Sequence, residues 1–136
     1  MSQNKPKILV VDDFAPGREL LAEYLEFSGY EVATAEDGAS ALEQADKFLP
    51  GAILMDLSLP GIDGWEATRR LRRGLRTRDM KIIALTAHAL ETEKDRALEA
   101  GCDEVITKPV LPRDLERAVR RLLGIEAPSR AKPGQE

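Results

Sequence analysis

The sequence has one cysteine, one histidine and no long apolar run, and these scarcities exclude several classes of protein. A single cysteine, Cys102, can form neither an intrachain disulfide framework nor a cysteine-rich zinc site, so we expect a reducing, cytoplasmic compartment. The first apolar stretch breaks at Asp12, which argues against a signal peptide, and no apolar run is long enough to span a bilayer. The net charge of −4 gives no electrostatic argument for nucleic acid or an anionic membrane as a partner.

Short apolar segments alternate with helical patterns along most of the chain. Strands are predicted at residues 7–11, 31–35, 52–56, 81–85 and 103–107. Helices are predicted before Gly29, at residues 38–48, 65–73 and 90–100, and after Pro112. This alternation is typical of an α/β domain with a parallel sheet, whose apolar central strands are buried on both faces. The alternating segment 31–35 suits an edge strand.

The length of 136 residues fits one domain, which can bury a core without disulfides or structural metals. We expect the ordered domain to cover residues 6–124. Residues 1–5 and 125–136 are expected to be disordered, because the C-terminal segment is polar, contains proline and glycine, and lacks periodicity. The sequence contains no internal repeat.

Chemically active side chains follow the predicted strands at the points where they end. Asp12 and Asp13 follow the first strand, and Asp56 ends the third. Thr86 ends the fourth strand and Lys108 comes directly after the fifth. Sites in open parallel sheets form at the carboxyl ends of strands, near the point where the strand order reverses. The sequence therefore predicts that these five side chains share one rim.

Three carboxylates on a small rim repel one another unless a cation lies among them. Mg²⁺ is a hard cation that binds one or two carboxylates together with water and phosphate oxygens. A carboxylate can also act as a nucleophile and form an aspartyl phosphate. Phosphoryl transfer needs positive charge on the phosphoryl oxygens, which a metal and Lys108 would supply, while Thr86 would supply a hydroxyl donor.

Four motifs, "ILVVDD", "ILMDLSLPGIDG", "IIALTA" and "VITKP", resemble the receiver domain of two-component response regulators. The resemblance covers residues 6–124, and the motifs occur in the family's order. It implies a flavodoxin-like, doubly wound sheet of five parallel strands in the order 2-1-3-4-5, with five helices. It also implies a signalling protein that catalyses only its own phosphorylation and dephosphorylation.

The resemblance assigns a role to each acid. Asp56 would be the phosphoacceptor and would take a phosphoryl group from a phosphohistidine. Asp13, Asp56 and the backbone carbonyl of Ser58 would bind Mg²⁺ directly, and Asp12 would hold a metal-bound water. The implied cofactor is therefore Mg²⁺.

The resemblance also assigns roles around the phosphoryl group. Lys108 would pair with it, and the Lys108-Pro109 bond would be cis. Thr86 would move toward a phosphoryl oxygen as the switch. The family usually has an aromatic switch residue three positions before the lysine, where this chain has Val105. We therefore expect the output face to respond through backbone and helix motion, with the first turns of the 90–100 helix poorly anchored.

Each site residue also has a plainer interpretation. Asp12 and Asp13 could cap the next helix, and Asp56 could be an ordinary turn acid. Thr86 could be a helix N-cap, and Lys108 could be a surface lysine. The combination of all five favours the phosphoryl site over these separate interpretations.

Other residues keep more than one interpretation. His88 is expected to be an exposed side chain beside the pocket, although a phosphorylated histidine, a metal ligand or a role with Ser58 in tuning hydrolysis are alternatives. Cys102 is expected in the core, and Trp65 in either the core or a surface groove. A group of arginines forms either a solvated helix face or a surface for an acidic partner: Arg69, Arg70, Arg72, Arg73, Arg76 and Arg78.

The sequence predicts a stand-alone phosphoryl-accepting receiver. Its expected partners are a sensor histidine kinase or a histidine phosphotransfer protein, and a downstream protein. The downstream protein would bind the face formed by the 90–100 helix, the 103–107 strand and the last helix, which starts at Pro112. One alternative is a receiver-like interaction module that is not phosphorylated. Another is a fragment of a hybrid kinase or larger regulator. A phosphatase with an aspartyl nucleophile fits poorly, because Asp12-Asp13-Phe14 is not Asp-x-Asp, and no GxGxxG motif indicates a dinucleotide.

Overall fold

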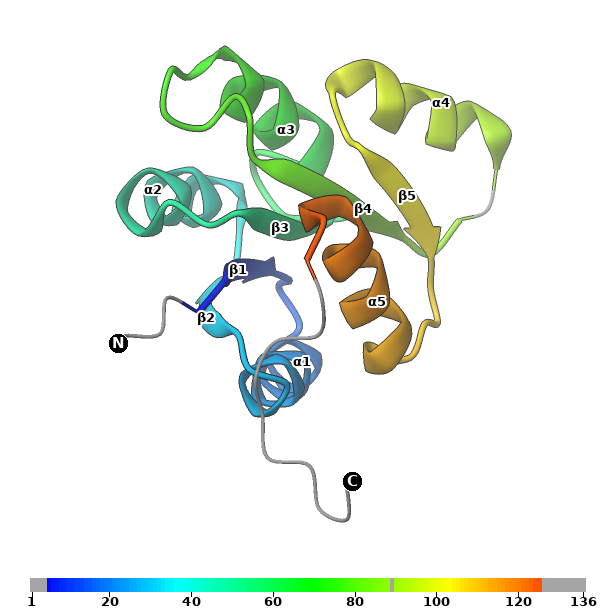
Figure 1. Ribbon diagram of the computed structural model, residues 1–136. Coiled ribbons are helices and arrows are strands. Elements are labelled where there is room, and N and C mark those ends of the chain that lie inside the picture. Colours follow the sequence, from blue (N-terminus) through cyan, green and yellow to red (C-terminus); the bar gives the residue numbers. More distant parts are fainter. Residues whose placement is uncertain (1–4, 89, 126–136) are drawn as a thin grey trace.

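The structure is a computed structural model that describes residues 5–88 and 90–125. Five strands alternate with five helices along the chain (Figure 1). The strands are β1 (Lys7–Val11), β2 (Glu31–Ala35), β3 (Ala52–Asp56), β4 (Lys81–Thr86) and β5 (Glu104–Thr107). The helices are α1 (Ala15–Phe27), α2 (Gly38–Phe48), α3 (Gly64–Arg73), α4 (Glu91–Ala100) and α5 (Pro112–Leu123).

The sheet is parallel, and its strand order is β2-β1-β3-β4-β5, as the family resemblance implies. The segment with the alternating pattern, β2, lies at an edge of the sheet. The strand order reverses between β1 and β3, so the ends of these two strands lie side by side. This is the place in an open α/β sheet where ligands usually bind.

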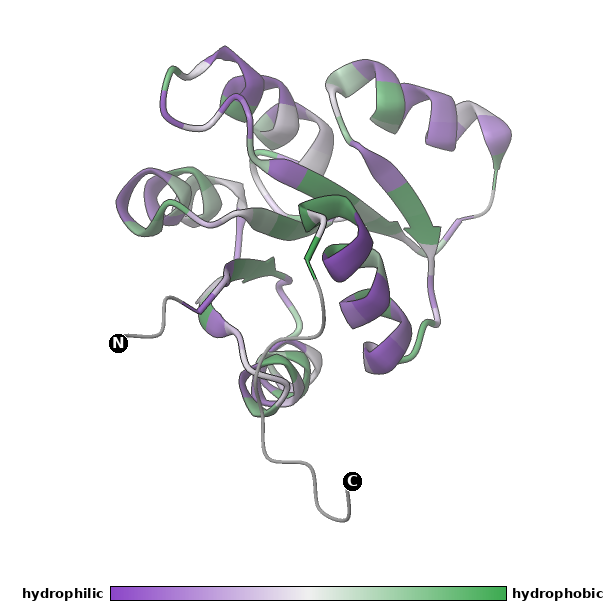
Figure 2. Ribbon diagram, viewed as in Figure 1, coloured by the Kyte–Doolittle hydropathy of each residue, from purple (hydrophilic) through white to green (hydrophobic). Residues whose placement is uncertain are grey.

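Two apolar layers cover the two faces of the sheet. One layer joins alternate strand residues to α2, α3 and α4, and the other joins the remaining strand residues to α1 and α5. Figure 2 shows β1, β3 and most of β4 as hydrophobic and the outward sides of the helices as mostly hydrophilic. Burial on both faces explains why β1, β3 and β4 are nearly continuous apolar runs.

Four elements differ from the predicted bounds, each by one residue at one end. The fifth strand begins at Glu104 and not at Asp103, because the carboxylate of Asp103 accepts a hydrogen bond from the backbone N–H of Ile82. The fourth strand extends to Thr86. Ile125 opens the segment that the sequence predicts to be disordered, yet it packs against the α1 and α5 layer. Residues 1–4 and 126–136, which hold the rest of the two predicted disordered segments, lie outside the described residues. No helix in the described part of the chain has both the length and the apolar character to cross a bilayer.

Candidate functional site

The predicted site residues meet at the carboxyl edge of the sheet. Asp12 and Asp13 directly follow β1, and Asp56 is the last residue of β3. Thr86 is the last residue of β4, and Lys108 follows the end of β5. The register pairs Thr86 with Thr107, so the ends of β4 and β5 are level. The sequence prediction that these side chains share one rim is therefore confirmed.

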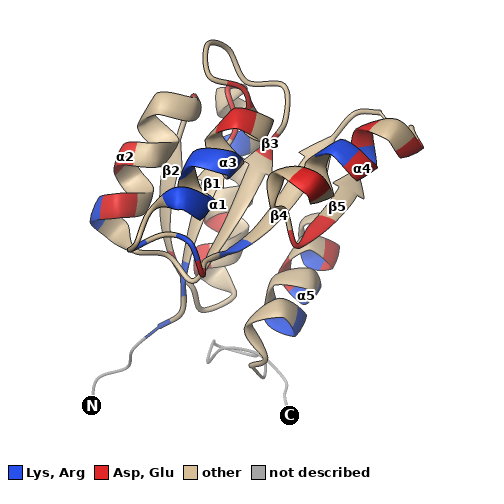
Figure 3. Ribbon diagram, turned by 90° about the horizontal axis from the view of Figure 1, so that it is seen from above, with Lys and Arg blue, Asp and Glu red and all other residues tan. Residues whose placement is uncertain are grey.

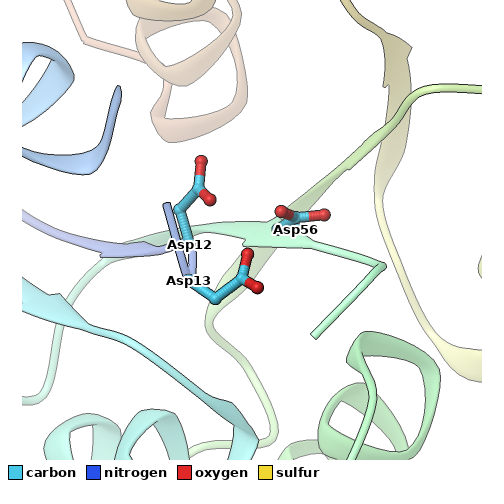
Figure 4. A group of neighbouring side chains, drawn as sticks. All are labelled: Asp12, Asp13 and Asp56. Carbon is cyan, nitrogen blue, oxygen red and sulfur yellow. The ribbon is translucent and has the colours of Figure 1, made fainter. Parts of the chain in front are cut away.

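Asp12, Asp13 and Asp56 form a compact acidic cluster (Figure 4). One carboxylate oxygen from each lies within 4.8 Å of the others. Asp56 is buried, Asp12 is half-buried and Asp13 is exposed, so the cluster opens to solvent on the Asp13 side. Three hard oxygen donors with an open side are the donor set that suits Mg²⁺, so the residues present fit this metal.

The positive charge within the cluster is smaller than the negative charge. Lys108 Nζ lies 3.4 Å from Asp56 Oδ2 and 3.9 Å from Asp12 Oδ2. One ammonium thus faces two carboxylates, and Asp13 adds a third. Burial raises the pKa of Asp12, although the N–H of Phe14 and the charge of Lys108 act to lower it. The site has an excess of negative charge that a divalent cation would balance.

Three of the side chains are held by the backbone two residues further along the chain. Their oxygens accept hydrogen bonds from N–H groups in three pairs: Asp12 from Phe14 (2.9 Å), Asp56 from Ser58 (2.9 Å) and Thr86 from His88 (3.1 Å). These local contacts fix the side chains through one oxygen each, and the second carboxylate oxygens of Asp12 and Asp56 face Lys108. In particular, the hydroxyl of Thr86 acts here as an acceptor, and its own proton remains available.

The plainer interpretations of Asp12, Asp13, Thr86 and Lys108 do not agree with the geometry. The residue that precedes α1 is Phe14, and no side chain caps this helix, so neither Asp12 nor Asp13 is its cap. Thr86 is not an N-cap, because Leu90 precedes α4. Lys108 contacts two carboxylates and is not an isolated surface lysine.

The comparison with family models decides the identity. Residues 8–120 match the response regulator receiver domain. The chain belongs to this family. The strand order and the site of this receiver domain agree with what the sequence motifs imply.

Named relatives support the assignment. The phosphate regulon transcriptional regulatory protein PhoB of Pseudomonas aeruginosa is 45% identical over 116 residues, which are 85% of this chain and 51% of the relative. PhoB of Escherichia coli is 39% identical over 117 residues, which are 86% of this chain and 51% of the relative. The chain therefore spans about half the length of the curated relatives it matches.

Solved structures agree in fold. The receiver domain of sensor histidine kinase PA1611 from Pseudomonas aeruginosa, solved with a magnesium ion in its active site cleft, has a TM-score of 0.81 at 36% identity. The match covers 88% of this chain and 98% of that one. A putative response regulator from Chloroflexus aurantiacus has a TM-score of 0.83 at 36% identity, covering 89% of this chain and 99% of that one.

Two glycines that the sequence analysis did not single out shape the receiver site. A Cβ at Gly64 would lie 2.6 Å from the carbonyl oxygen of Asp56, and a Cβ at Gly38 would collide with the carbonyl oxygen of Ile62. Only glycine permits the segment after Asp56 to pack this closely between α2 and α3. Each glycine follows an N-cap aspartate, and this repeated Asp-Gly pair is the sequence signal that could have located both.

The structure also shows where the other residues singled out in the sequence lie. His88 is exposed beside the site, Cys102 is buried, and the Lys108-Pro109 bond is cis, all as predicted. Trp65 is half-buried and packs against the apolar layer of α3 and α4, so it lies at the margin of the core. Val105 packs half-buried against the same layer.

The solvated-face prediction is wrong for one arginine of the group. Arg72 donates hydrogen bonds to three backbone carbonyls, those of Gly101, Arg78 and Met80, and pairs with Asp103 at 2.9 Å. Its guanidinium joins the end of α3 to the starts of β4 and β5 because five N–H donors can serve several acceptors at once. Other arginines of the group pair with surface acids: Arg69, Arg70 and Arg73 with Glu66, and Arg76 with Asp46.

Proposed function

We propose that this receiver domain accepts a phosphoryl group on Asp56 from a phosphohistidine of a histidine kinase or phosphotransfer protein. The observation that carries the proposal is a buried carboxylate with an ammonium 3.4 Å away and two further carboxylates beside it. Burial and the contact with Lys108 hold Asp56 in one orientation, and its neighbours can hold a metal. The family match supports this function.

Asp13, Asp56 and the carbonyl of Ser58 would hold Mg²⁺, and Asp12 would hold a water on the metal. The bound ion would supply positive charge to the phosphoryl oxygens. The N–H of Ser58 donates to Asp56 Oδ1, so Ser58 adjoins the acidic cluster, which supports its part in the proposal. The exposure of Asp13 leaves the site open to an entering ion.

The transfer step uses groups of this chain for attack and charge. A carboxylate oxygen of Asp56 forms a bond to phosphorus while the bond from phosphorus to the donor's imidazole nitrogen breaks. The imidazole leaves with the electron pair and takes a proton from solvent. Lys108 neutralises the phosphoryl oxygens, and Thr86 rotates its hydroxyl proton toward one of them. Water later hydrolyses the acyl phosphate and restores the carboxylate.

Phosphorylation would replace the single negative charge of the Asp56 carboxylate at the end of β3 by a phosphoryl group that carries roughly −1.5 to −2. Attraction of Thr86 and Lys108 to that charge would move the ends of β4 and β5, which continue into α4 and α5. We propose that a downstream protein reads this change in the cytoplasm at the face of α4, β5 and α5. A receiver-like module that is never phosphorylated is disfavoured by the presence of Asp56, Thr86 and Lys108 together.

The decisive test compares wild type with Asp56→Ala in the presence of Mg²⁺ and beryllofluoride, a phosphoryl mimic. Amide NMR of wild type is expected to show shifts around Asp56 and Thr86, and the variant is expected to show none. Asp79→Ala, which removes an exposed acid outside the cluster, serves as the matched control and should behave as wild type. Equal spectra of wild type with and without beryllofluoride would contradict the proposal.

A further inference from the structure

Trp65 is a buried donor without an acceptor. It is the first residue after Gly64 in α3, and its ring packs against the apolar layer shared with α4. Within the described part of the chain, its indole Nε1 is enclosed and has no hydrogen-bond partner. A buried polar group without a partner is rare and destabilises the arrangement that holds it. The packing of Trp65 in this structure is therefore incomplete.

Arg96 of α4 covers the ring of Trp65. Its guanidinium carbon lies 4.1 Å from the ring centroid, within the range of a cation–π contact. Glu93 and Glu99 lie three residues before and after Arg96, the spacing at which helical ion pairs form. Among the described residues, however, Arg96 forms no salt bridge. In Figure 3 the basic residues of α4 lie between acidic ones, so an alternative partner is close at hand.

The phosphoacceptor is connected to this contact by closely packed backbone. Gly64 directly precedes Trp65, and a Cβ at Gly64 would lie 2.6 Å from the carbonyl oxygen of Asp56 and 2.8 Å from Leu57 Cα. There is no free space between these segments, so a shift of the backbone at Asp56 displaces the start of α3. Figure 1 shows α3 and α4 side by side. The contact between Trp65 and Arg96 joins these two helices.

We propose that the Trp65–Arg96 contact conveys the state of Asp56 to α4. This inference rests on the proposed function, because it assigns a regulatory route to the same site. In the resting state Arg96 covers the indole ring and holds α4 against α3. In the phosphorylated state the start of α3 shifts, the indole N–H gains an acceptor, and Arg96 turns to Glu93 or Glu99. Because the two states differ in these contacts, phosphorylation changes how firmly α4 is held.

Trp65 is the one tryptophan of the chain, so its fluorescence reports on this contact specifically. Bound beryllofluoride is measured separately by ¹⁹F NMR, with Mg²⁺ present throughout. In wild type we expect loading to shift the Trp65 emission to longer wavelength, to increase its quenching by iodide and to move the indole N–H signal. These changes should follow the same titration curve as the ¹⁹F signal.

Arg96→Gln tests the arginine, and Lys94→Gln is the matched control because it removes the same charge from the same helix. Arg96→Gln should show a resting emission close to that of loaded wild type. It should also bind beryllofluoride roughly two- to fivefold more tightly, as expected when a cation–π contact of the resting state is lost. Lys94→Gln should titrate as wild type.

The two proposals fail in different ways. A bound ¹⁹F signal with unchanged Trp65 emission and N–H shift, and equal titration of Arg96→Gln and wild type, would overturn this inference and leave the proposed function intact. Absence of a bound ¹⁹F signal in wild type would overturn the proposed function and this inference with it.

Discussion

The two ends of the parallel sheet differ in how their charged groups are paired. At the amino ends of β4 and β5, the guanidinium of Arg72 donates to three carbonyls and pairs with Asp103, whose carboxylate also accepts from the N–H of Ile82. At the carboxyl ends, the ammonium of Lys108 faces the carboxylates of Asp12 and Asp56, and Asp13 adds a third carboxylate to the cluster. A network whose hydrogen-bond donors and acceptors are matched stabilises the fold. A cluster with an excess of negative charge is suited to bind a cationic ligand.

The largest expected effect is at the carboxyl end. Lys108→Met keeps the aliphatic stem and removes the ammonium, so the phosphoryl oxygens lose a positive partner. We expect the rate of phosphorylation from a small phosphodonor to fall about 10²- to 10³-fold, the usual cost of losing one such donor. Lys81→Met, which removes an ammonium at the amino end of the sheet, should leave the rate unchanged. Equal rates in wild type and Lys108→Met would show that the ammonium is not used.

At the amino end, the expected effect is on stability. Arg72→Met removes the side-chain donor of three carbonyls and leaves Asp103 without its cation, and urea unfolding should show a loss of about 2–3 kcal/mol. Arg70→Met, which removes an exposed ion pair with Glu66, should cost less than about 0.5 kcal/mol. If both variants lose a similarly small part of the free energy of unfolding, Arg72 contributes no more to stability than a surface arginine.

Asp13→Asn tests the acidic cluster in two ways, because it should stabilise the metal-free protein and weaken the binding of Mg²⁺. Without metal, removal of one like charge should raise the unfolding free energy by about 0.5–1 kcal/mol. With Mg²⁺ at about 100 times its dissociation constant, wild type should gain about 2.7 kcal/mol, and the variant should gain much less. Thermal unfolding with and without Mg²⁺ measures both, with Asp79→Asn as the control. If Asp13→Asn is less stable than wild type without metal, and if Mg²⁺ stabilises both proteins equally, the proposed excess of negative charge at the site is wrong.

The smallest expected effect concerns Cys102, which lies beside the Arg72 network. Burial raises the pKa of its thiol from 9.0 to about 11. The folded state then binds the thiol proton more tightly than the unfolded state, so this contribution to stability is constant below about pH 9 and is lost as the pH rises toward 11. Alkylation of native protein at pH 8 should accordingly be much slower than that of urea-unfolded protein. Equal alkylation rates in native and unfolded protein would show that Cys102 is accessible to the reagent in the folded state.

Much of the fold follows from local sequence. Five apolar segments predict the strands, and the side chains that follow them are placed on one rim because parallel strands end at the same edge. The site residues could be predicted for that reason. The strand order came from the family resemblance and not from periodicity.

The contacts between helices could not be predicted in this way. Arg72 and Gly101 are 29 residues apart, and Trp65 and Arg96 meet only because α3 and α4 lie side by side. The sequence pattern predicts that a charged side chain on a helix is exposed to solvent. Its actual partners depend on how neighbouring helices are placed on the sheet. The close approach of Gly64 to Asp56 is likewise a property of the packed backbone.

Intact-mass measurement after incubation with Mg²⁺ and a small phosphodonor tests the central claim most directly. The account predicts that wild type gains the mass of one phosphoryl group, that peptide mapping places it on Asp56, and that a metal chelator or Asp56→Ala abolishes it. No gain in mass, or a phosphoryl group on His88 in place of Asp56, would contradict the account.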